Sequence, residues 1–254
     1  MISPLAYIDP AAKVGNNVTI QPFAYIEADV EIGDDCVIMP QASILNGTRL
    51  GKNNKVHQGA VLGATPQDFH YTGEKSTLVI GDNNDIRENV VISRATHEKD
   101  STIIGNNNSL MDGVHICHDV KIGNNCVLGI KSTLAGNCVL DDNVILSSSV
   151  LLQQKSHIGL WSFIQGGCRI SKDVPPYTIM AGNPAAYHGI NAVILSHHKM
   201  SERILRHISN AYHLVYQGNI SIQDALQKIK EQVPMSEEIE NILHFISLSK
   251  GIVK

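Results

Sequence analysis

An aliphatic residue recurs at every sixth position over most of this chain, and this period constrains the fold more than any other feature. The series runs from Ile8 to Leu62, resumes from Ile80 to Ile92, and continues unbroken from Ile104 to Ile170. An α-helix, with 3.6 residues per turn, cannot keep a strict six-residue phase, whereas the two-residue alternation of a β-strand divides six evenly. The period therefore predicts short strands that each turn one aliphatic side chain inward.

A second period of 18 residues overlies the first. Glycine follows the aliphatic residue at 18-residue intervals, and pairs of Asn or Asp come next, as in Gly15-Asn16-Asn17 and Gly105-Asn106-Asn107. Gly, Asn and Asp tolerate the positive φ angles that tight corners need. Three hexads per 18 residues indicate one triangular coil, so we expect a β-solenoid of the parallel β-helix type, with about 4.8 Å between coils.

The period is interrupted twice. Leu50 and Ile80 are 30 residues apart, and Ile80 and Ile104 are 24 apart, so each interval holds one coil plus an insertion. The insertions fall near 64–76 and 96–101. Loops that leave a rigid scaffold often carry function, although a tolerated surface insertion explains the same spacing.

The hexads end at Ile170, and a turn-rich stretch over 173–184 follows. Helical periodicity then replaces the six-residue period. Polar residues suited to helix N-termini predict three helices, which open at Ser201, Ser221 and Ser236. We therefore expect a β-helix over 1–190 and a helical domain over 191–254.

The composition excludes several classes of protein. With 254 residues, 43% hydrophobic residues and a net charge of −4, the chain is too apolar for intrinsic disorder. Twenty Lys and Arg against 24 Asp and Glu give no basic excess for nucleic acid, so we expect no such partner. No apolar run reaches the roughly 20 residues of a membrane span. Residues 1–10 lack the layout of a signal peptide, so we expect a cytoplasmic protein.

The five cysteines form no CxxC pair and are odd in number. A disulfide framework and a cysteine zinc site are therefore not indicated. Four of the five occupy the small slot of the hexad, so we expect reduced, mostly buried thiols.

The segment His115-Ile116-Cys117-His118-Asp119 is the best candidate for chemistry. The hexad phase turns Ile116 inward and leaves both histidines at a corner. A neutral imidazole can take a proton from a substrate hydroxyl, and Asp119 could orient it. Two solvated corner histidines explain the same residues equally well.

Other chemistries find less support in the sequence. No Ser-His-Asp or Cys-His arrangement and no phosphate-binding glycine loop can be read, so a base acting directly on the substrate is favoured. A zinc site like that of gamma-class carbonic anhydrases would need His115, His118 and a third ligand such as His57 or His97. The spacing of the first two does not match that family, and we expect no metal.

Several motifs together resemble one known family. They are Gln67-Asp68-Phe69-His70-Tyr71, the His115–Asp119 cluster, Asp173-Val174-Pro175-Pro176-Tyr177 and Asn210-Ala211-Tyr212, in the same order and spacing. With the hexads, they make the chain resemble, over essentially its full length, the bacterial acyl-carrier-protein–UDP-N-acetylglucosamine O-acyltransferases of lipid A biosynthesis.

The resemblance implies a left-handed β-helix that forms a homotrimer, with active sites between neighbouring subunits. It implies transfer of an (R)-3-hydroxyacyl group from acyl carrier protein to the glucosamine 3-hydroxyl of UDP-N-acetylglucosamine. No separate cofactor is implied, because the acyl group arrives on the phosphopantetheine of the carrier protein. That partner is acidic, so a local basic patch is expected despite the negative net charge.

The resemblance also implies residue roles. His118 would be the general base, supported by Asp119, and the backbone N–H of Gly136 would hold the thioester oxyanion. The residues implied to contact substrate are Asp68 and Gln154 (sugar), Asn191 (nucleotide), His115, His70, His197 and His198, with Gly166 at the position that limits acyl length. The chain departs from the family pattern at His70, where a lysine is usual, at Asn137 and Gln153, where histidines are usual, and at His197 and His198, where arginines are usual.

Three alternatives remain at this stage. The N-acyltransferase of the same pathway usually carries an N-terminal uridine-binding domain, for which hexads starting at Ile8 leave no room. A zinc protein predicts bound metal. A purely structural β-helix predicts neither acyl transfer nor binding of a UDP-sugar.

Overall fold

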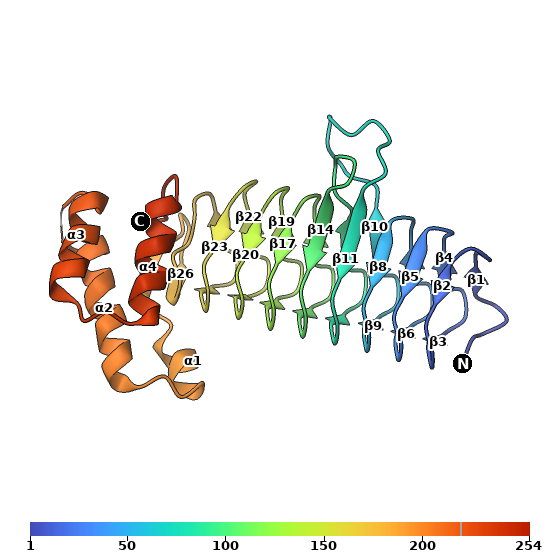
Figure 1. Ribbon diagram of the computed structural model, residues 1–254, viewed down its shortest axis with the longest axis horizontal. Coiled ribbons are helices and arrows are strands. Elements are labelled where there is room, and N and C mark those ends of the chain that lie inside the picture. Colours follow the sequence, from blue (N-terminus) through green and yellow to red (C-terminus); the bar gives the residue numbers. More distant parts are fainter. Residues whose placement is uncertain (219) are drawn as a thin grey trace.

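A three-sided prism of short strands, followed by a group of helices, makes up the structure (Figure 1). This is a computed structural model, and it describes residues 1–218 and 220–254. The left-handed parallel β-helix with C-terminal helices that the sequence predicts is confirmed.

Each face of the prism is one sheet, and consecutive strands along the chain fall on successive faces, except that the last two strands both join the third sheet. Sheet 1 contains β1 (Tyr7–Ile8), β4 (Tyr25–Ile26), β7 (Ser43–Ile44), β10 (Val61–Ala64), β13 (Val91–Ser93), β16 (His115–Ile116), β19 (Thr133–Leu134), β22 (Leu151–Leu152) and β25 (Arg169–Ile170). Sheet 2 contains β2 (Lys13–Val14), β5 (Val30–Ile32), β8 (Thr48–Leu50), β11 (Thr77–Ile80), β14 (Ser101–Ile104), β17 (Lys121–Ile122), β20 (Val139–Leu140) and β23 (His157–Ile158). Sheet 3 contains β3 (Thr19–Ile20), β6 (Val37–Ile38), β9 (Lys55–Val56), β12 (Asp85–Ile86), β15 (Ser109–Leu110), β18 (Val127–Leu128), β21 (Ile145–Leu146), β24 (Phe163–Ile164), β26 (Thr178–Ala181) and β27 (Ala186–Ile190).

The coils stack in register, so the inward residues form continuous ladders. Ile116 pairs with Leu134, and Leu134 pairs with Leu152, each one coil further along the chain. All three side chains are fully buried. Asn107 and Asn125 turn the same corner in successive coils at φ values of 57° and 56°, as the Asn and Asp repeats predict.

The last strand differs from the parallel pattern. β27 pairs antiparallel with β26, which the hexad period does not predict. Only a few residues separate the two strands, and so short a connection cannot make the crossover that parallel pairing requires. The β26–β27 hairpin therefore ends the prism next to the helices.

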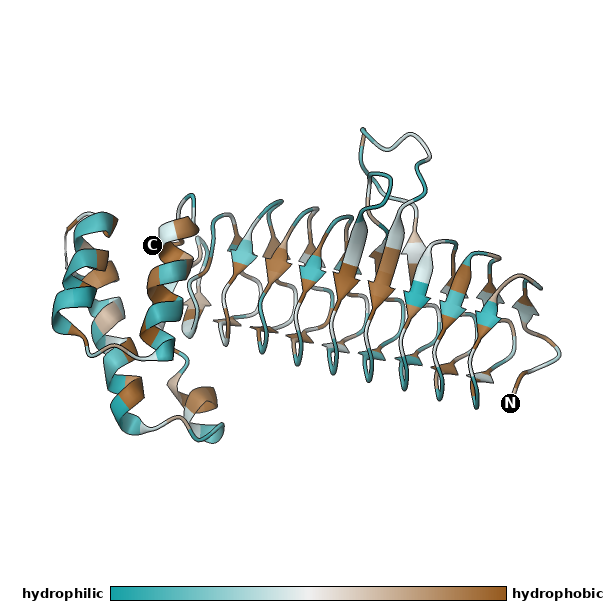
Figure 2. Cartoon of the chain, viewed as in Figure 1, coloured by the Kyte–Doolittle hydropathy of each residue, from teal (hydrophilic) through white to brown (hydrophobic). Residues whose placement is uncertain are grey.

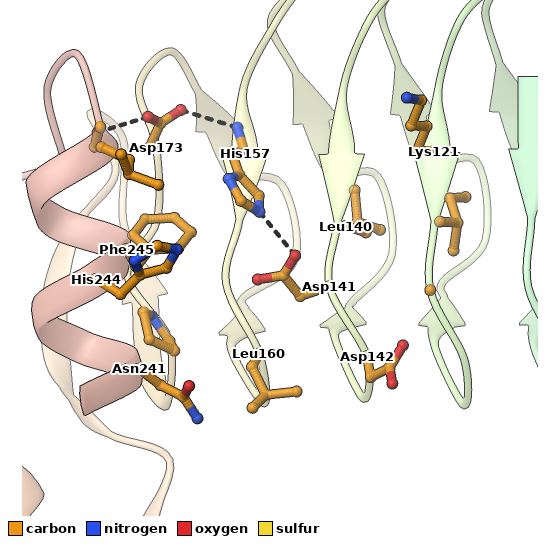
Figure 3. A pocket seen from close by; sticks show the side chains of 15 residues that line it. Lys121, Leu140, Asp141, Asp142, His157, Leu160, Asp173, Asn241, His244 and Phe245 are labelled. Atoms are coloured by element: carbon orange, nitrogen blue, oxygen red, sulfur yellow. Dashed lines mark hydrogen bonds and ion pairs between the residues drawn. The ribbon is translucent and has the colours of Figure 1, made fainter. Parts of the chain in front are cut away.

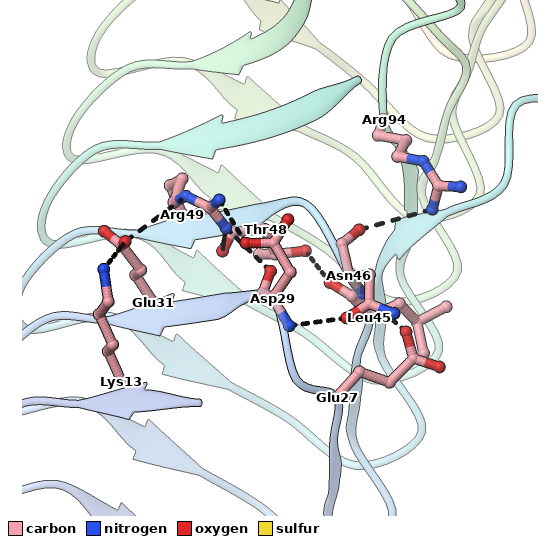
Figure 4. A network of polar contacts seen from close by, with 9 residues as sticks. All are labelled: Lys13, Glu27, Asp29, Glu31, Leu45, Asn46, Thr48, Arg49 and Arg94. Carbon is pink, nitrogen blue, oxygen red and sulfur yellow. Dashed lines mark hydrogen bonds and ion pairs between the residues drawn. The ribbon is translucent and has the colours of Figure 1, made fainter. Parts of the chain in front are cut away.

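The connections from β10 to β11 and from β13 to β14 leave the prism side by side and rise above it (Figure 1). Arg94 fastens them together. Its guanidinium donates to Tyr71 Oη at 2.6 Å and to the Gly63 carbonyl at 3.1 Å, and it lies 5.6 Å from the centre of the Tyr71 ring. A third bond reaches the Asn46 carbonyl, which ties the loops to the corner network of the earlier coils (Figure 4).

Charged residues on the earliest coils of sheet 2 are paired with one another. Lys13 lies 2.8 Å from Glu31, and Arg49 contacts Asp29 at 2.6 Å (Figure 4). The outward residues turn apolar further along, on β11 and β14, as the hydropathy colouring shows (Figure 2). Lys13 and Arg49 therefore already have carboxylate partners.

Four helices follow the prism: α1 (Ala192–His197), α2 (Glu202–Tyr216), α3 (Ile222–Gln232) and α4 (Glu237–Leu248). The helices predicted to open at Ser201, Ser221 and Ser236 are confirmed as α2, α3 and α4. The Ser201 and Ser221 side chains each accept a backbone N–H of the first turn, whereas Ser236 makes no such bond. The helices share a second core, in which the fully buried Tyr212 donates its hydroxyl proton to the Pro176 carbonyl at the end of the prism.

The ladder predicts a clear stability difference between inward and outward positions. Ile116→Ala removes a fully buried side chain from the stack, so we expect the free energy of unfolding to fall by about 2–5 kcal/mol. Lys121→Ala, at an exposed position one strand later, should change it by no more than about 0.5 kcal/mol. Urea denaturation followed by circular dichroism measures both variants, and equal effects would contradict this account of the core.

Candidate active site

His118 sits at the corner between β16 and β17, where its side chain is only 7% exposed. Its Nδ1 lies 2.7 Å from Asp119 Oδ2 and 2.9 Å from Thr96 Oγ1. Thr96 also donates its hydroxyl to Asp119 Oδ2 at 2.8 Å and its backbone N–H to Oδ1 at 3.2 Å. Because these acceptors surround Nδ1, the network places a proton on Nδ1, and Nε2 is the ring nitrogen turned away from Asp119.

The β10–β11 loop places Asp68 opposite that second nitrogen. Asp68 Oδ2 lies 3.2 Å from His118 Nε2. Asp68 Oδ1 accepts hydrogen bonds from the backbone N–H and from Nδ1 of His70, both at 2.8 Å. The His70 backbone bond, followed by the imidazole bond, lowers the pKa of Asp68, so its carboxyl stays ionised at neutral pH. The imidazole thus lies between two carboxylates, one at each nitrogen.

Gly136 lies one coil beyond His118, in the corner between β19 and β20. A Cβ atom at this position would lie 2.4 Å from Cε1 and 2.6 Å from Nε2 of His118. Any side chain here would displace the imidazole, so the glycine allows the backbone to approach the ring closely. In the described ranges, the Gly136 N–H donates to no acceptor.

A cavity of about 290 Å³ opens beside these residues, along the edge between sheets 1 and 2. Four of the residues implied by the family resemblance line it, together with five others. The lining residues are Asp68, His70, Asp119 and Gln154, with Thr96, His97, Asp100, Asn137 and Lys155.

The remaining candidate residues lie elsewhere on the same chain. His115 is on β16, outside this cavity, and burial lowers its pKa and so favours its neutral form. Asn191 is buried before α1 and donates to the Trp161 carbonyl at 2.9 Å. His198 packs on the Trp161 ring at 4.5 Å, and His197 lies 5.6 Å from His198.

The candidate residues lie on different edges of the prism. Trp161, which Asn191 and His198 contact, lies at the edge between sheets 2 and 3, where the chain passes from β23 to β24. Gly166 lies at the edge between sheets 3 and 1, where a Cβ would meet the Ser148 carbonyl at 3.1 Å. One chain by itself therefore brings together the catalytic and sugar candidates, but neither the nucleotide candidates nor the acyl-length position.

Sequence reasoning missed Thr96 and Lys155 as site residues. Thr96 falls within the second insertion, and no period links it to His118. Its position directly after the interrupted coil was the one available signal. Lys155 follows Gln154 in the corner two coils after His118, and the 18-residue period could have placed it beside the site.

A larger cavity, of about 650 Å³, lies between sheet 2 and α4, and none of the candidate residues lines it (Figure 3). His157 projects into it, 2.8 Å from Asp141 and 4.6 Å from the centre of the Phe245 ring. Volume alone therefore does not mark the site.

In residues 1–218 and 220–254, no three His, Cys, Asp or Glu side chains are arranged to hold a metal ion. No helix of these ranges combines the length and apolar character of a membrane-crossing segment.

Comparison with known proteins first defines the class. The bacterial transferase hexapeptide family matches residues 11–42, 29–64 and 101–129, and domain 2 of the UDP-N-acetylglucosamine O-acyltransferases matches 173–253. These two matches define the class as a hexapeptide-repeat transferase with the C-terminal domain of the UDP-N-acetylglucosamine O-acyltransferases.

Individual relatives then define the family. The chain is 51% identical to the UDP-N-acetylglucosamine acyltransferase of Bacteroides fragilis, with a TM-score of 0.99 and 100% of both chains covered. It is 31% identical to the LpxA structure from Acinetobacter baumannii, with a TM-score of 0.94, covering 100% of this chain and 99% of that one. It is also 38% identical to the acyl-[acyl-carrier-protein]–UDP-N-acetylglucosamine O-acyltransferase of Halorhodospira halophila, over 100% of this chain and 99% of that protein. The chain belongs to the family of acyl-[acyl-carrier-protein]–UDP-N-acetylglucosamine O-acyltransferases and is an acyltransferase.

The contact between Gly136 and the imidazole predicts the effect of a single methyl group. In Gly136→Ala the new Cβ and the His118 ring must move apart by about 1 Å, and a displacement of that size can cost about 100-fold in rate. We expect that loss in acyl-transfer turnover, with a melting temperature close to wild type. Wild-type turnover in this variant would contradict the close approach.

The Thr96 hydroxyl predicts a smaller effect. Thr96→Val keeps the shape of the side chain but removes the hydroxyl that contacts both His118 and Asp119. Losing a hydrogen bond to a charged group costs about 1.5–3 kcal/mol, so we expect kcat to fall roughly 10- to 100-fold with KM little changed. Thr96→Ser should restore most of the rate, and a Ser variant as slow as the Val variant would contradict the role of the hydroxyl.

Proposed function

We propose that this protein transfers an (R)-3-hydroxyacyl group from acyl carrier protein to the 3-hydroxyl of UDP-N-acetylglucosamine, the first step of lipid A biosynthesis. One observation carries the proposal. His118 is hydrogen-bonded through Nδ1 to Asp119, and its Nε2 lies beside the backbone of Gly136 and opposite Asp68, next to a cavity that Asp68 and Asp119 line. A base and a hydrogen-bond donor within one small volume are what attack of a hydroxyl on a thioester requires.

The reaction follows from these two groups. His118 Nε2 takes the proton of the sugar hydroxyl as its oxygen bonds to the thioester carbonyl carbon. The carbonyl oxygen gains the negative charge and accepts the Gly136 N–H, and one such donor is typically worth roughly 3 kcal/mol of barrier. The carbon–sulfur bond then breaks, and the thiolate of the phosphopantetheine takes the proton from the imidazolium. Asp119 stabilises that imidazolium through Nδ1.

Asp68 has two positions in this proposal. Without substrate its carboxylate lies against His118 Nε2, where the sugar hydroxyl has to enter. Binding of the sugar would turn the carboxylate from the imidazole to a sugar hydroxyl, with Gln154 contacting the sugar from the opposite wall. The same movement would free Nε2 to act as base.

The distribution of candidates over three edges supports a homotrimer. Asn191, His197 and His198 are proposed to bind the nucleotide, yet they lie on a different edge from His118. A neighbouring copy packed against the prism would bring that edge to the catalytic one. His115 would contact substrate at the same junction, and the missing side chain of Gly166 would leave room for a long acyl chain.

The proposed nucleotide contacts carry a consequence for charge. His70, His197 and His198 replace residues that are permanently charged in the family pattern, so an imidazole would meet phosphate where a lysine or arginine is usual. Asn137 and Gln153 cannot titrate at all. The proposed donor carries its acyl group on phosphopantetheine, so the proposal includes no separate cofactor and places the protein in the cytoplasm with the carrier protein.

Turnover of a His118 variant tests the mechanism. We expect His118→Ala to lose several orders of magnitude in kcat, because both the base and the later proton donor are removed. His213→Ala, an exposed histidine of α2, is the matched control and should retain wild-type turnover. Circular dichroism and gel filtration check that both variants keep their fold and assembly.

Two outcomes would contradict the proposal. Near-normal turnover in His118→Ala would remove His118 as the base. Acylation of UDP-3-O-acyl-glucosamine in place of UDP-N-acetylglucosamine would assign the chain to the N-acylation step instead.

A further inference from the structure

A second cavity, of about 260 Å³, adjoins the candidate active site and contains three lysines. Lys155, Lys172 and Lys250 line it, and it shares Gln154 and Lys155 with the cavity beside His118. The two cavities therefore lie next to each other along one edge of the prism.

The fold assembles the three lysines from distant parts of the chain. Lys155 turns a corner at a φ of 66°, and Lys172 follows β25 at the end of the prism. The segment after α4 is bound there, because the Asp173 N–H donates to the Gly251 carbonyl at 3.1 Å and the Val253 N–H to the Asp173 carbonyl at 2.9 Å. This attachment brings Lys250 beside Lys172.

None of the three ammonium groups has a carboxylate within 4 Å in the described part of the chain. The contrast with Lys13 and Arg49, whose charges are paired at the other end of the prism, is clear (Figure 4). Asp173 does line the cavity, but its two oxygens already accept the His157 N–H at 2.9 Å and the Ser249 hydroxyl at 2.6 Å (Figure 3). Three lysines against one carboxylate leave the cavity with an excess of positive charge, which favours binding of an anion.

We propose that Lys155, Lys172 and Lys250 form a phosphate-binding subsite for one of the two substrates. The proposal rests on the proposed function, because both substrates carry phosphate at a distance from the reacting atom. With about 4.8 Å per coil, Lys155 lies two coils, or about 10 Å, and Lys172 three coils, or about 14 Å, beyond His118. Lysine suits a phosphate approached from several directions, because its ammonium acts as a point charge.

Two sources can supply this phosphate. One is the phosphodiester that joins the pantetheine arm to the carrier protein, and the other is the diphosphate of the nucleotide sugar. The nucleotide candidates Asn191, His197 and His198 lie on another edge of the same chain. A nucleotide diphosphate would therefore bind between this cavity and that edge of a neighbouring copy, whereas the phosphodiester of the carrier protein would need only this cavity. Matched ligands with and without phosphate separate them.

Equilibrium binding tests the subsite. Isothermal calorimetry compares 4′-phosphopantetheine with pantetheine, and UDP with uridine, on the wild-type protein and on the triple variant Lys155→Gln, Lys172→Gln, Lys250→Gln. The control is the triple variant Lys55→Gln, Lys228→Gln, Lys230→Gln, which changes net charge equally at exposed or partly exposed positions away from the cavity.

We expect the wild-type protein and the control to bind the phosphorylated member of one pair at least tenfold more tightly, and the cavity variant to lose that preference. Loss in the pantetheine pair assigns the subsite to the acyl donor, and loss in the uridine pair assigns it to the nucleotide. Retention of both preferences, or equal loss in the control, would overturn the subsite. So would weakened binding of intact acyl carrier protein with unchanged binding of free phosphopantetheine, because the lysines would then contact the surface of the carrier protein. Binding does not depend on turnover, so this result and that of the His118 variant stand separately.

Discussion

The in-register stacking of parallel coils at 18-residue intervals is the constraint on which the rest of the structure depends. It turns sequence spacing directly into spatial position: His118 lies above Gly136, and Gly136 lies above Gln154, because their hexads pair one coil apart. The fully buried ladder beneath them leaves little freedom at the corners, since side chains in a close-packed interior cannot shift independently. A rigid edge of this kind can hold an imidazole and a backbone N–H in contact without flexible loops.

The two insertions supply further contacts to the imidazole of His118. The first supplies Asp68 at Nε2 of His118, and the second supplies Thr96 at Nδ1, while Arg94 and Tyr71 fasten the loops to each other. In the proposed mechanism, Asp119 orients the imidazole, and Asp68 occupies the place of the incoming hydroxyl. The sugar would have to displace Asp68 to reach Nε2, so substrate binding and release of the base would be one event. This order would keep Nε2 occupied until an acceptor is present.

Much of the fold could be predicted because its determinants are periodic. The aliphatic hexads define the three sheets, the Asn and Asp pairs define the corners, and Ser201 and Ser221 mark helix starts through local hydrogen bonds. α1 escaped prediction because its six residues are too few to show a period. The antiparallel strand β27 could not be predicted from the hexads, because the reversal of direction depends on the short turn after β26.

The site divides in the same way between periodic and non-periodic residues. Positions on the coils, such as Gln154, follow from arithmetic once His118 is chosen. Thr96 and Lys250 reach their positions through loop and terminal conformations that no spacing rule describes.

A crystal structure with UDP-N-acetylglucosamine bound is the most direct test of the central claim, that His118 Nε2 exchanges Asp68 for the acceptor hydroxyl. The account predicts the sugar 3-hydroxyl within hydrogen-bond distance of Nε2, with the Asp68 carboxylate moved onto the sugar. A bound sugar that leaves Asp68 against the imidazole, or that places its 3-hydroxyl away from His118, would contradict it.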